Sequence, residues 1–74
     1  MSREDAIRLE GRVVEALPNG AFRVELPNGH RLWAFGPRRM RDALAALAAG
    51  DKVMMDLSPG DFSKGRIVQI GKPV

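Results

Sequence analysis

The sequence predicts an all-β protein, a barrel of five strands with one short helix between the third and fourth strands. Three observations lead to this fold class. Short segments alternate between apolar and polar residues, clusters of glycine, proline and asparagine separate them, and one alanine-rich segment with helical spacing interrupts the series. Five strands with a helix after the third are the order of the OB-fold, a Greek-key barrel whose strands 2 and 3 and adjoining loops bind oligonucleotides.

Length and composition set further limits. Seventy-four residues allow one small domain, so we expect a single OB-fold domain over residues 1–74 with disordered ends at about 1–5 and 71–74. The chain has no cysteine and one histidine, which excludes disulfides and multi-histidine or thiolate metal sites, and we expect no metal and no cofactor. No apolar run reaches the roughly 18 residues of a membrane span, and no signal peptide is evident. We therefore expect a cytoplasmic monomer with no membrane partner.

The first predicted strand begins at Ile7. Ile7, Leu9, Gly11 and Val13 alternate with charged residues, which is typical of a strand with one buried face. The alternation slips at Val13-Val14, which predicts a β-bulge, and Gly11 would also permit a bend. We therefore expect this strand to bend.

The tetrapeptide Leu-Pro-Asn-Gly occurs twice, at Leu17 to Gly20 and at Leu26 to Gly29. Asn-Gly is a strong hairpin signal because a type I′ turn needs positive φ at both central residues. Proline has no amide donor and suits a strand end. The flanking segments do not resemble one another, which argues against a duplicated unit. The two copies therefore predict two turns of one three-stranded meander, with strands at about 22–26 and 31–35.

The second half of the chain contains the predicted helix and two strands. Gly36-Pro37 ends the third strand. Met40, Leu44 and Leu47 have helical spacing in an alanine-rich segment, so we expect a helix of two to three turns that packs this stripe on the sheet and stops near Gly50. Strands are expected over 53–57 and 66–70, joined by a turn-rich loop over 58–65.

The net charge of +3 is distributed unevenly. The segment from His30 to Arg41 contains four arginines and no acid, whereas the rest of the chain has eight basic and nine acidic side chains. A local excess of cations is typical of a surface that binds a polyanion, and a solvated charged loop is the alternative.

The third predicted strand could carry aromatic and basic side chains on one face. If Leu32 points into the barrel, the two-residue period turns Arg31, Trp33 and Phe35 outward, next to Arg23. Aromatic rings interleaved with cations stack unpaired bases, at about 1–3 kcal/mol per base. The opposite register would bury Trp33 and Phe35 as core residues.

Further cations lie at the start of the predicted helix and in the last predicted loop. Arg38, Arg39 and Arg41 would oppose the helix dipole, at a cost of about 0.3–1 kcal/mol each. Their position is explained if a phosphate binds there, and a solvated surface is the alternative. In the last loop, Lys64 and Arg66 flank a glycine that would let a backbone approach closely, which is a weaker motif.

No catalytic site is expected. His30 is the only histidine, and no serine or acid has a diagnostic spacing to it. The nine carboxylates are scattered along the chain, so no paired-carboxylate chemistry is indicated.

Four stretches repeat a known pattern in order and spacing: LPNGAFRVELPNGH, RMR after the third predicted strand, GDKV at the fourth, and DFSKGRIV at the fifth. Over about Glu4 to Val68, the chain resembles bacterial translation initiation factor one. The resemblance implies an OB-fold bound at the decoding (A) site of the small ribosomal subunit. There it would contact ribosomal RNA and a neighbouring ribosomal protein, block premature aminoacyl-tRNA entry, and assist the second and third initiation factors without catalysis.

The resemblance also implies RNA contacts at the matching positions Arg23, His30, Arg39, Met40, Arg41, Lys64 and Arg66, while Lys52 and Ser63 match the pattern without an assigned role. With the candidates above, the expected RNA-binding residues are Arg23, His30, Arg31, Trp33, Phe35, Arg38, Arg39, Met40, Arg41, Lys64 and Arg66.

The chain also departs from the family pattern. Trp33, Phe35, Pro37 and Asp42 stand where the family usually has a small polar residue, a histidine, a serine and a basic residue. The departures reduce electrostatic attraction to RNA on the helix side and enlarge the aromatic face. The alternative function is a general single-stranded RNA chaperone of the cold-shock kind, although the closely spaced aromatic motifs of that class are absent.

Overall fold

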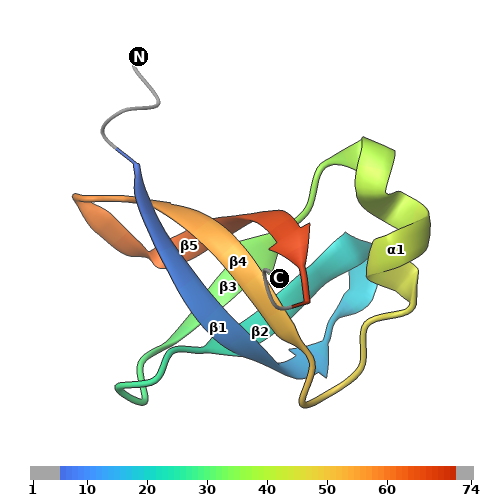
Figure 1. Cartoon of the computed structure of the whole chain (residues 1–74), viewed down its shortest axis with the longest axis horizontal. Coiled ribbons are helices and arrows are strands. Elements are labelled where there is room, and N and C mark those ends of the chain that lie inside the picture. Colours follow the sequence, from blue (N-terminus) through green and yellow to red (C-terminus); the bar gives the residue numbers. More distant parts are fainter. Residues whose placement is uncertain (1–5, 72–74) are drawn as a thin grey trace.

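Five strands close into a barrel in the computed structural model, which describes residues 6–71 (Figure 1). The elements are β1 (Ile7–Ala16), β2 (Ala21–Glu25), β3 (Arg31–Phe35), α1 (Arg41–Ala45), β4 (Lys52–Ser58) and β5 (Asp61–Ile70). The strand order is β1-β2-β3-β5-β4, and β4 pairs again with β1. All pairs are antiparallel except β3 with β5. The predicted OB-fold, with its helix between the third and fourth strands, is confirmed.

The predicted ends fall almost entirely outside this description. Residues 1–5 and 72–74 lie outside the described part of the chain. Gly71 is described and forms a bend with a φ of 83°.

The barrel interior is filled by the apolar residues at alternate strand positions. Val24, Val53, Met55 and Ile67 are fully buried, as the two-residue period requires of inward positions. Burying one such side chain contributes about 1.5–3 kcal/mol. Among residues 6–71 no polar or charged side chain is buried, so the core of this small domain is wholly apolar.

The first strand changes partner at the predicted bulge. Its first half pairs with β4 and its second half with β2, and the register with β2 shifts between Val13 and Glu15. The bulge bends β1 so that one strand can close two sides of the barrel. Gly11 is required for packing, because a Cβ there would lie 2.4 Å from Cγ1 of Val24.

The two Leu-Pro-Asn-Gly copies form the same kind of loop, although the predicted type I′ turn is wrong. Leu17 N–H donates to the Ala21 carbonyl and Leu26 N–H donates to the His30 carbonyl, both at 2.8 Å. Each loop therefore contains three residues, Pro-Asn-Gly, and its glycine has a positive φ, 76° at Gly20 and 90° at Gly29. Proline before the Asn-Gly pair favours this longer loop because its φ suits the first loop position.

The predicted helix is shorter than expected. A 3-10 turn, Arg38–Met40, leads into α1, which has five residues. Beyond α1, Leu47 N–H donates to the Leu44 carbonyl at 3.1 Å, a spacing of three residues that tightens the chain. Leu44 and Leu47 are buried and Met40 packs partly buried against the core, so the apolar stripe is confirmed. The length differs because the chain bends to bring both leucines onto the barrel.

The fifth strand starts earlier than expected, so the predicted loop over 58–65 is wrong. Only Pro59 and Gly60 separate β4 from β5. The residues after Asp61 that favour turns lie in β5, where its pairing with β4 is irregular. Between the pairs Ser58–Asp61 and Asp56–Arg66, β5 has four residues where β4 has one. The β3–β5 pairing, which begins at Lys64, extends the strand where local propensity predicted a loop.

Candidate nucleic-acid interface

The outer surfaces of β2, β3 and β5 form one continuous face, which we call the aromatic–basic face; its residues are Arg23, Arg31, Trp33, Phe35, Lys64 and Arg66. Leu32 and Ala34 are 3% and 0% exposed and point into the barrel. The alternate residues of β3 therefore point outward, and Trp33 and Phe35 are 43% and 46% exposed. The outward register is confirmed, and burial of these two rings in the core is wrong.

Trp33 lies at the centre of this face. It pairs with Arg23 on β2 and with Lys64 on β5. The Arg23 guanidinium lies 5.1 Å from the centroid of the indole ring, a cation–π distance. A cation therefore lies at the indole ring and another stands on the neighbouring strand.

Phe35 connects the face to the segment after β3. It pairs with Arg66, and Pro37, Lys64 and Arg66 line a shallow hollow together with Phe35 and Gly36. An exposed ring beside two cations can stack a base while a phosphate is held nearby. The hollow brings residues of β5 next to Pro37, which precedes Arg38, Arg39 and Arg41. We call residues 38–41 the basic segment.

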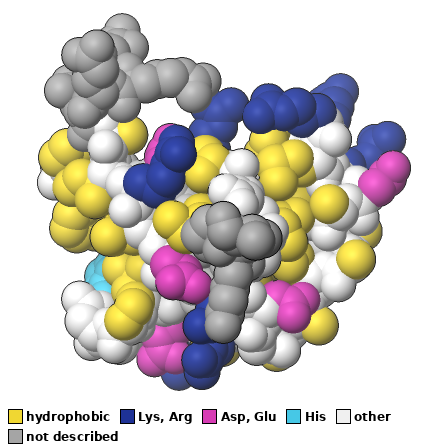
Figure 2. All heavy atoms as spheres, in the orientation of Figure 1, with side chains coloured by type: hydrophobic (Ala, Val, Ile, Leu, Met, Phe, Trp, Pro, Cys, Tyr) yellow, Lys and Arg dark blue, Asp and Glu magenta, His cyan; other side chains and the backbone are white. Residues whose placement is uncertain are grey.

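The basic segment itself is exposed. Arg38, Arg39 and Arg41 are all on the surface, and Figure 2 shows Lys and Arg side chains along the upper rim, above the region where β3 leads to α1. Because α1 has only five residues, the expected opposition to a helix dipole is too weak to explain them. Their exposure and charge still suit phosphate, but the helix N-terminus does not supply a site.

A wider groove separates this segment from the β1–β2 loop. Arg38 and Arg41 line it, with Leu17, Phe22 and Leu44 among the apolar residues of its floor. Arg39 does not line it. Met40, an expected RNA contact, is half-buried and packs against the core.

His30 and Phe62 are linked at the other end of the face. His30 Nε2 lies 2.9 Å from the Phe62 carbonyl oxygen. Phe62 is 42% exposed, which makes it a third exposed aromatic residue. Phe62 is not among the expected RNA-binding residues, because it lies in the predicted loop over 58–65. The usable signal was an aromatic residue two positions before Lys64.

Three other residues of the motifs have structural roles. Gly65 faces the core, where a Cβ would lie 3.1 Å from Cδ1 of Leu32, so the expectation that it admits a close backbone is wrong. The hydroxyl and N–H of Ser63 donate to Asp61 Oδ1. Lys52 lies 3.8 Å from Glu10 Oε2.

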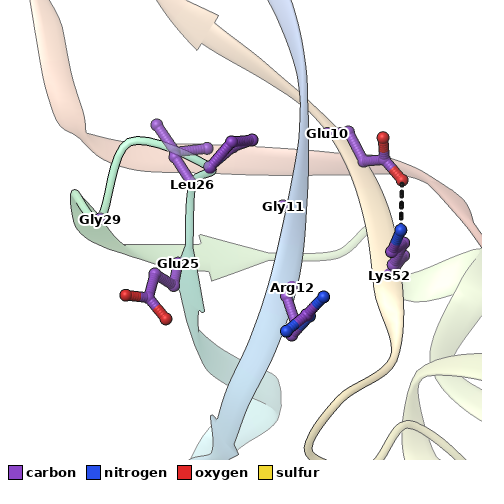
Figure 3. A pocket seen from close by; sticks show the side chains of 8 residues that line it. Glu10, Gly11, Arg12, Glu25, Leu26, Gly29 and Lys52 are labelled. Carbon is purple, nitrogen blue, oxygen red and sulfur yellow. Dashed lines mark ion pairs between the residues drawn. The ribbon is translucent and has the colours of Figure 1, made fainter.

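The side of the barrel around β1 has a different character. A hollow around Gly11 on β1 is lined by Glu10, Arg12, Glu25 and Lys52 among others, and Figure 3 shows the Glu10–Lys52 ion pair at its edge. None of the expected RNA-binding residues lines it. Acids and bases alternate there, and Figure 2 shows the same mixture over β1 and β4, so this side offers no continuous cationic track.

The ion pairs lie at the surface of the barrel. Glu25 and Arg31 lie 4.0 Å apart on the edge of the aromatic–basic face, which contributes about 0–1 kcal/mol. Arg8 Nε lies 2.9 Å from Asp56 Oδ1, and this hydrogen bond and charge raise the pKa of Arg8.

Within residues 6–71, no group of three or more His, Cys, Asp or Glu side chains could hold a metal ion. In the same range, no helix is long and apolar enough to cross a membrane.

Comparison with known proteins agrees with this geometry. The family model for Translation initiation factor 1A / IF-1 matches residues 2–73. The chain belongs to this family. Membership makes it a translation initiation factor with an RNA-binding OB-fold, from a family of non-enzymatic factors that bind the small ribosomal subunit.

Solved structures also resemble the chain. The solution structure of translation initiation factor one from the Wolbachia endosymbiont strain TRS of Brugia malayi is 29% identical, with a TM-score of 0.73, and the match covers 99% of this chain and 86% of that one. The crystal structure of YjeQ from Thermotoga maritima is 24% identical, with a TM-score of 0.66 over 89% of this chain and 23% of that one. The second likeness shows the shared fold alone.

Proposed function

We propose that this initiation factor binds ribosomal RNA at the decoding (A) site of the small subunit and blocks premature entry of aminoacyl-tRNA there. It also contacts a ribosomal protein near the site and assists the second and third initiation factors. It acts as a cytoplasmic monomer. Family membership supports the setting, and the aromatic–basic face supports the mode of binding.

The observation that carries the proposal is the continuity of the aromatic–basic face with the basic segment. Trp33 and Phe35 offer exposed rings, and Arg23, Lys64 and Arg66 surround them on adjacent strands. Unpaired bases stack on aromatic rings, and cations bind the phosphates that link these bases. The decoding site offers both chemistries, because its unpaired adenines can leave their stack to meet a protein surface.

Chemical probing of small-subunit RNA, with and without the protein, tests this proposal. We expect protection confined to the decoding site, at one protein per subunit, and binding that weakens steeply with salt. Protection elsewhere, or none, would contradict the site.

A second candidate is a general single-stranded RNA chaperone, favoured by the three exposed aromatic residues. The chaperone should bind free unstructured RNA as tightly as intact subunits, whereas a decoding-site factor should prefer the subunit. Competition between a labelled unstructured RNA and small subunits at one salt concentration distinguishes the two functions.

A further inference from the structure

The first residues of β5 pair irregularly with their neighbouring strands. The pairing of β5 with β3 begins at Lys64, and its pairing with β4 passes from Asp61 to Arg66. Phe62 and Ser63 therefore have no partner residue in either ladder. Backbone groups outside a ladder need other partners to hold their conformation.

One contact on this segment comes from the β2–β3 loop. His30 Nε2 lies 2.9 Å from the Phe62 carbonyl oxygen, 32 residues away in the chain. A second contact is internal, since Ser63 N–H donates to Asp61 Oδ1 at 2.9 Å. The histidine contact joins the segment to the β2–β3 loop.

The loop orients His30 for this contact. Its N–H donates to Asn28 Oδ1 at 2.9 Å, and its carbonyl accepts from Leu26 N–H at 2.8 Å. Gly29, with a φ of 90°, sets the direction in which the chain leaves the loop. Both backbone groups of His30 are therefore held by hydrogen bonds, which orients its ring toward Phe62.

The partner also decides which nitrogen carries the proton. A carbonyl oxygen only accepts, so His30 must donate from Nε2. In the neutral ring the remaining Nδ1 is an acceptor, which a phosphate oxygen cannot use. The ring N–H that a phosphate contact of the neutral ring would need is already engaged.

We propose that His30 is a positioning residue, which holds Phe62 and the start of β5 so that Phe62 and Lys64 stand ready on the RNA-binding side. This assignment replaces a direct contact of His30 with a phosphate. Its RNA-binding consequence rests on the proposed function, whereas the contact itself does not. Phe62 then adds a third ring to those of Trp33 and Phe35.

Two substitutions test the proposal. His30→Ala removes the donor, and His30→Gln keeps an amide N–H at nearly the position of Nε2. In the free protein, we expect amide exchange at Ser63 and Lys64 to accelerate in His30→Ala and to return close to the original rate in His30→Gln. Unchanged exchange in His30→Ala, with the variant still folded by circular dichroism, would overturn the proposal without reference to RNA.

Binding to small subunits provides the second measurement. We expect His30→Ala to weaken binding about 2- to 10-fold, the effect of one hydrogen bond, with an unchanged salt slope, and His30→Gln to restore it. If His30→Ala lowers the slope of log affinity against log salt by about 0.7–0.9 and His30→Gln does not restore it, a phosphate contact has been lost. That result would overturn the proposal. If the subunit does not bind the unmodified protein, the proposed function fails, while the exchange result still decides the role of His30.

Discussion

The Arg23 guanidinium lies 5.1 Å from the centroid of the Trp33 ring, across the β2–β3 ladder. The pair places a cation against the only tryptophan of the chain, at the centre of the aromatic–basic face. An aromatic ring ordered in this way loses less side-chain entropy when a base stacks on it. The geometry therefore favours binding to unpaired RNA and makes Trp33 the first residue to test.

Replacement of Trp33 by alanine should weaken binding to the small subunit by about 5- to 150-fold, because one stacked base contributes about 1–3 kcal/mol. Trp33→Phe should lose much less, since it keeps an aromatic face. Equilibrium binding of labelled protein to purified subunits measures both. Equal affinities for the original protein and Trp33→Ala would show that no base stacks there.

The double substitution Arg39→Ala/Arg41→Ala should weaken binding and lower the slope of log affinity against log salt. Each lost phosphate contact should lower the slope by about 0.7–0.9. Arg12→Ala is the matched control, because Arg12 is exposed on β1 in the hollow of mixed charge. Binding titrations at a series of salt concentrations measure the slopes. Equal slopes in the double variant and the control would show that the two arginines do not contact phosphates.

Gly36→Ala should destabilise the fold by about 1–3 kcal/mol, because the new Cβ would lie 2.2 Å from Cδ1 of Leu44, the buried residue of α1. Leu44→Ala should cost about 2–5 kcal/mol by leaving a cavity. The double variant should cost less than the sum, since one new methyl group fills part of the space that the leucine leaves. Urea unfolding of the four proteins completes the cycle, and additive costs would mean that the two residues do not share this space.

The pKa of Asp61 is lowered from its ordinary value of 3.8 by the Ser63 hydroxyl, with further contributions from the Ser63 N–H and the charge of Lys64. A carboxyl group whose folded-state pKa is lowered stabilises the fold above its unfolded-state pKa, and this contribution is lost as the pH falls through the folded-state pKa. Ser63→Ala should therefore raise the pKa of Asp61, and Ser63→Thr should keep it low. Carboxyl NMR titration measures the pKa of Asp61 in both variants. An unchanged pKa of Asp61 in Ser63→Ala would show that the hydroxyl does not cause the shift.

Elements with a clear local pattern could be predicted from the sequence. Alternation from Ile7 to Val13 placed Val13 inside the barrel, and a break in this alternation located the bulge next to it. These predictions succeed because a two-residue period is a property of the extended backbone itself. The order of five strands and one helix then determined the fold class, and the family motifs determined the setting.

The failures share a different cause. Residues 58–65 have loop propensity, yet residues 61–65 belong to β5, whose pairing with β3 begins at Lys64. The helix ends early because two leucines must reach the core. In both cases contacts between residues distant in the chain outweigh propensities of a few tenths of a kcal/mol per residue.

The sequence by itself determined the barrel, the position of the cations after the third strand and the family. Only the tertiary structure decided that Trp33 and Phe35 face outward, that Gly65 packs on the core and that His30 bonds to Phe62. A strand of five residues fits either register until its neighbours bury one face. A hydrogen bond between residues 30 and 62 forms only when the barrel closes, so no local sequence pattern predicts it.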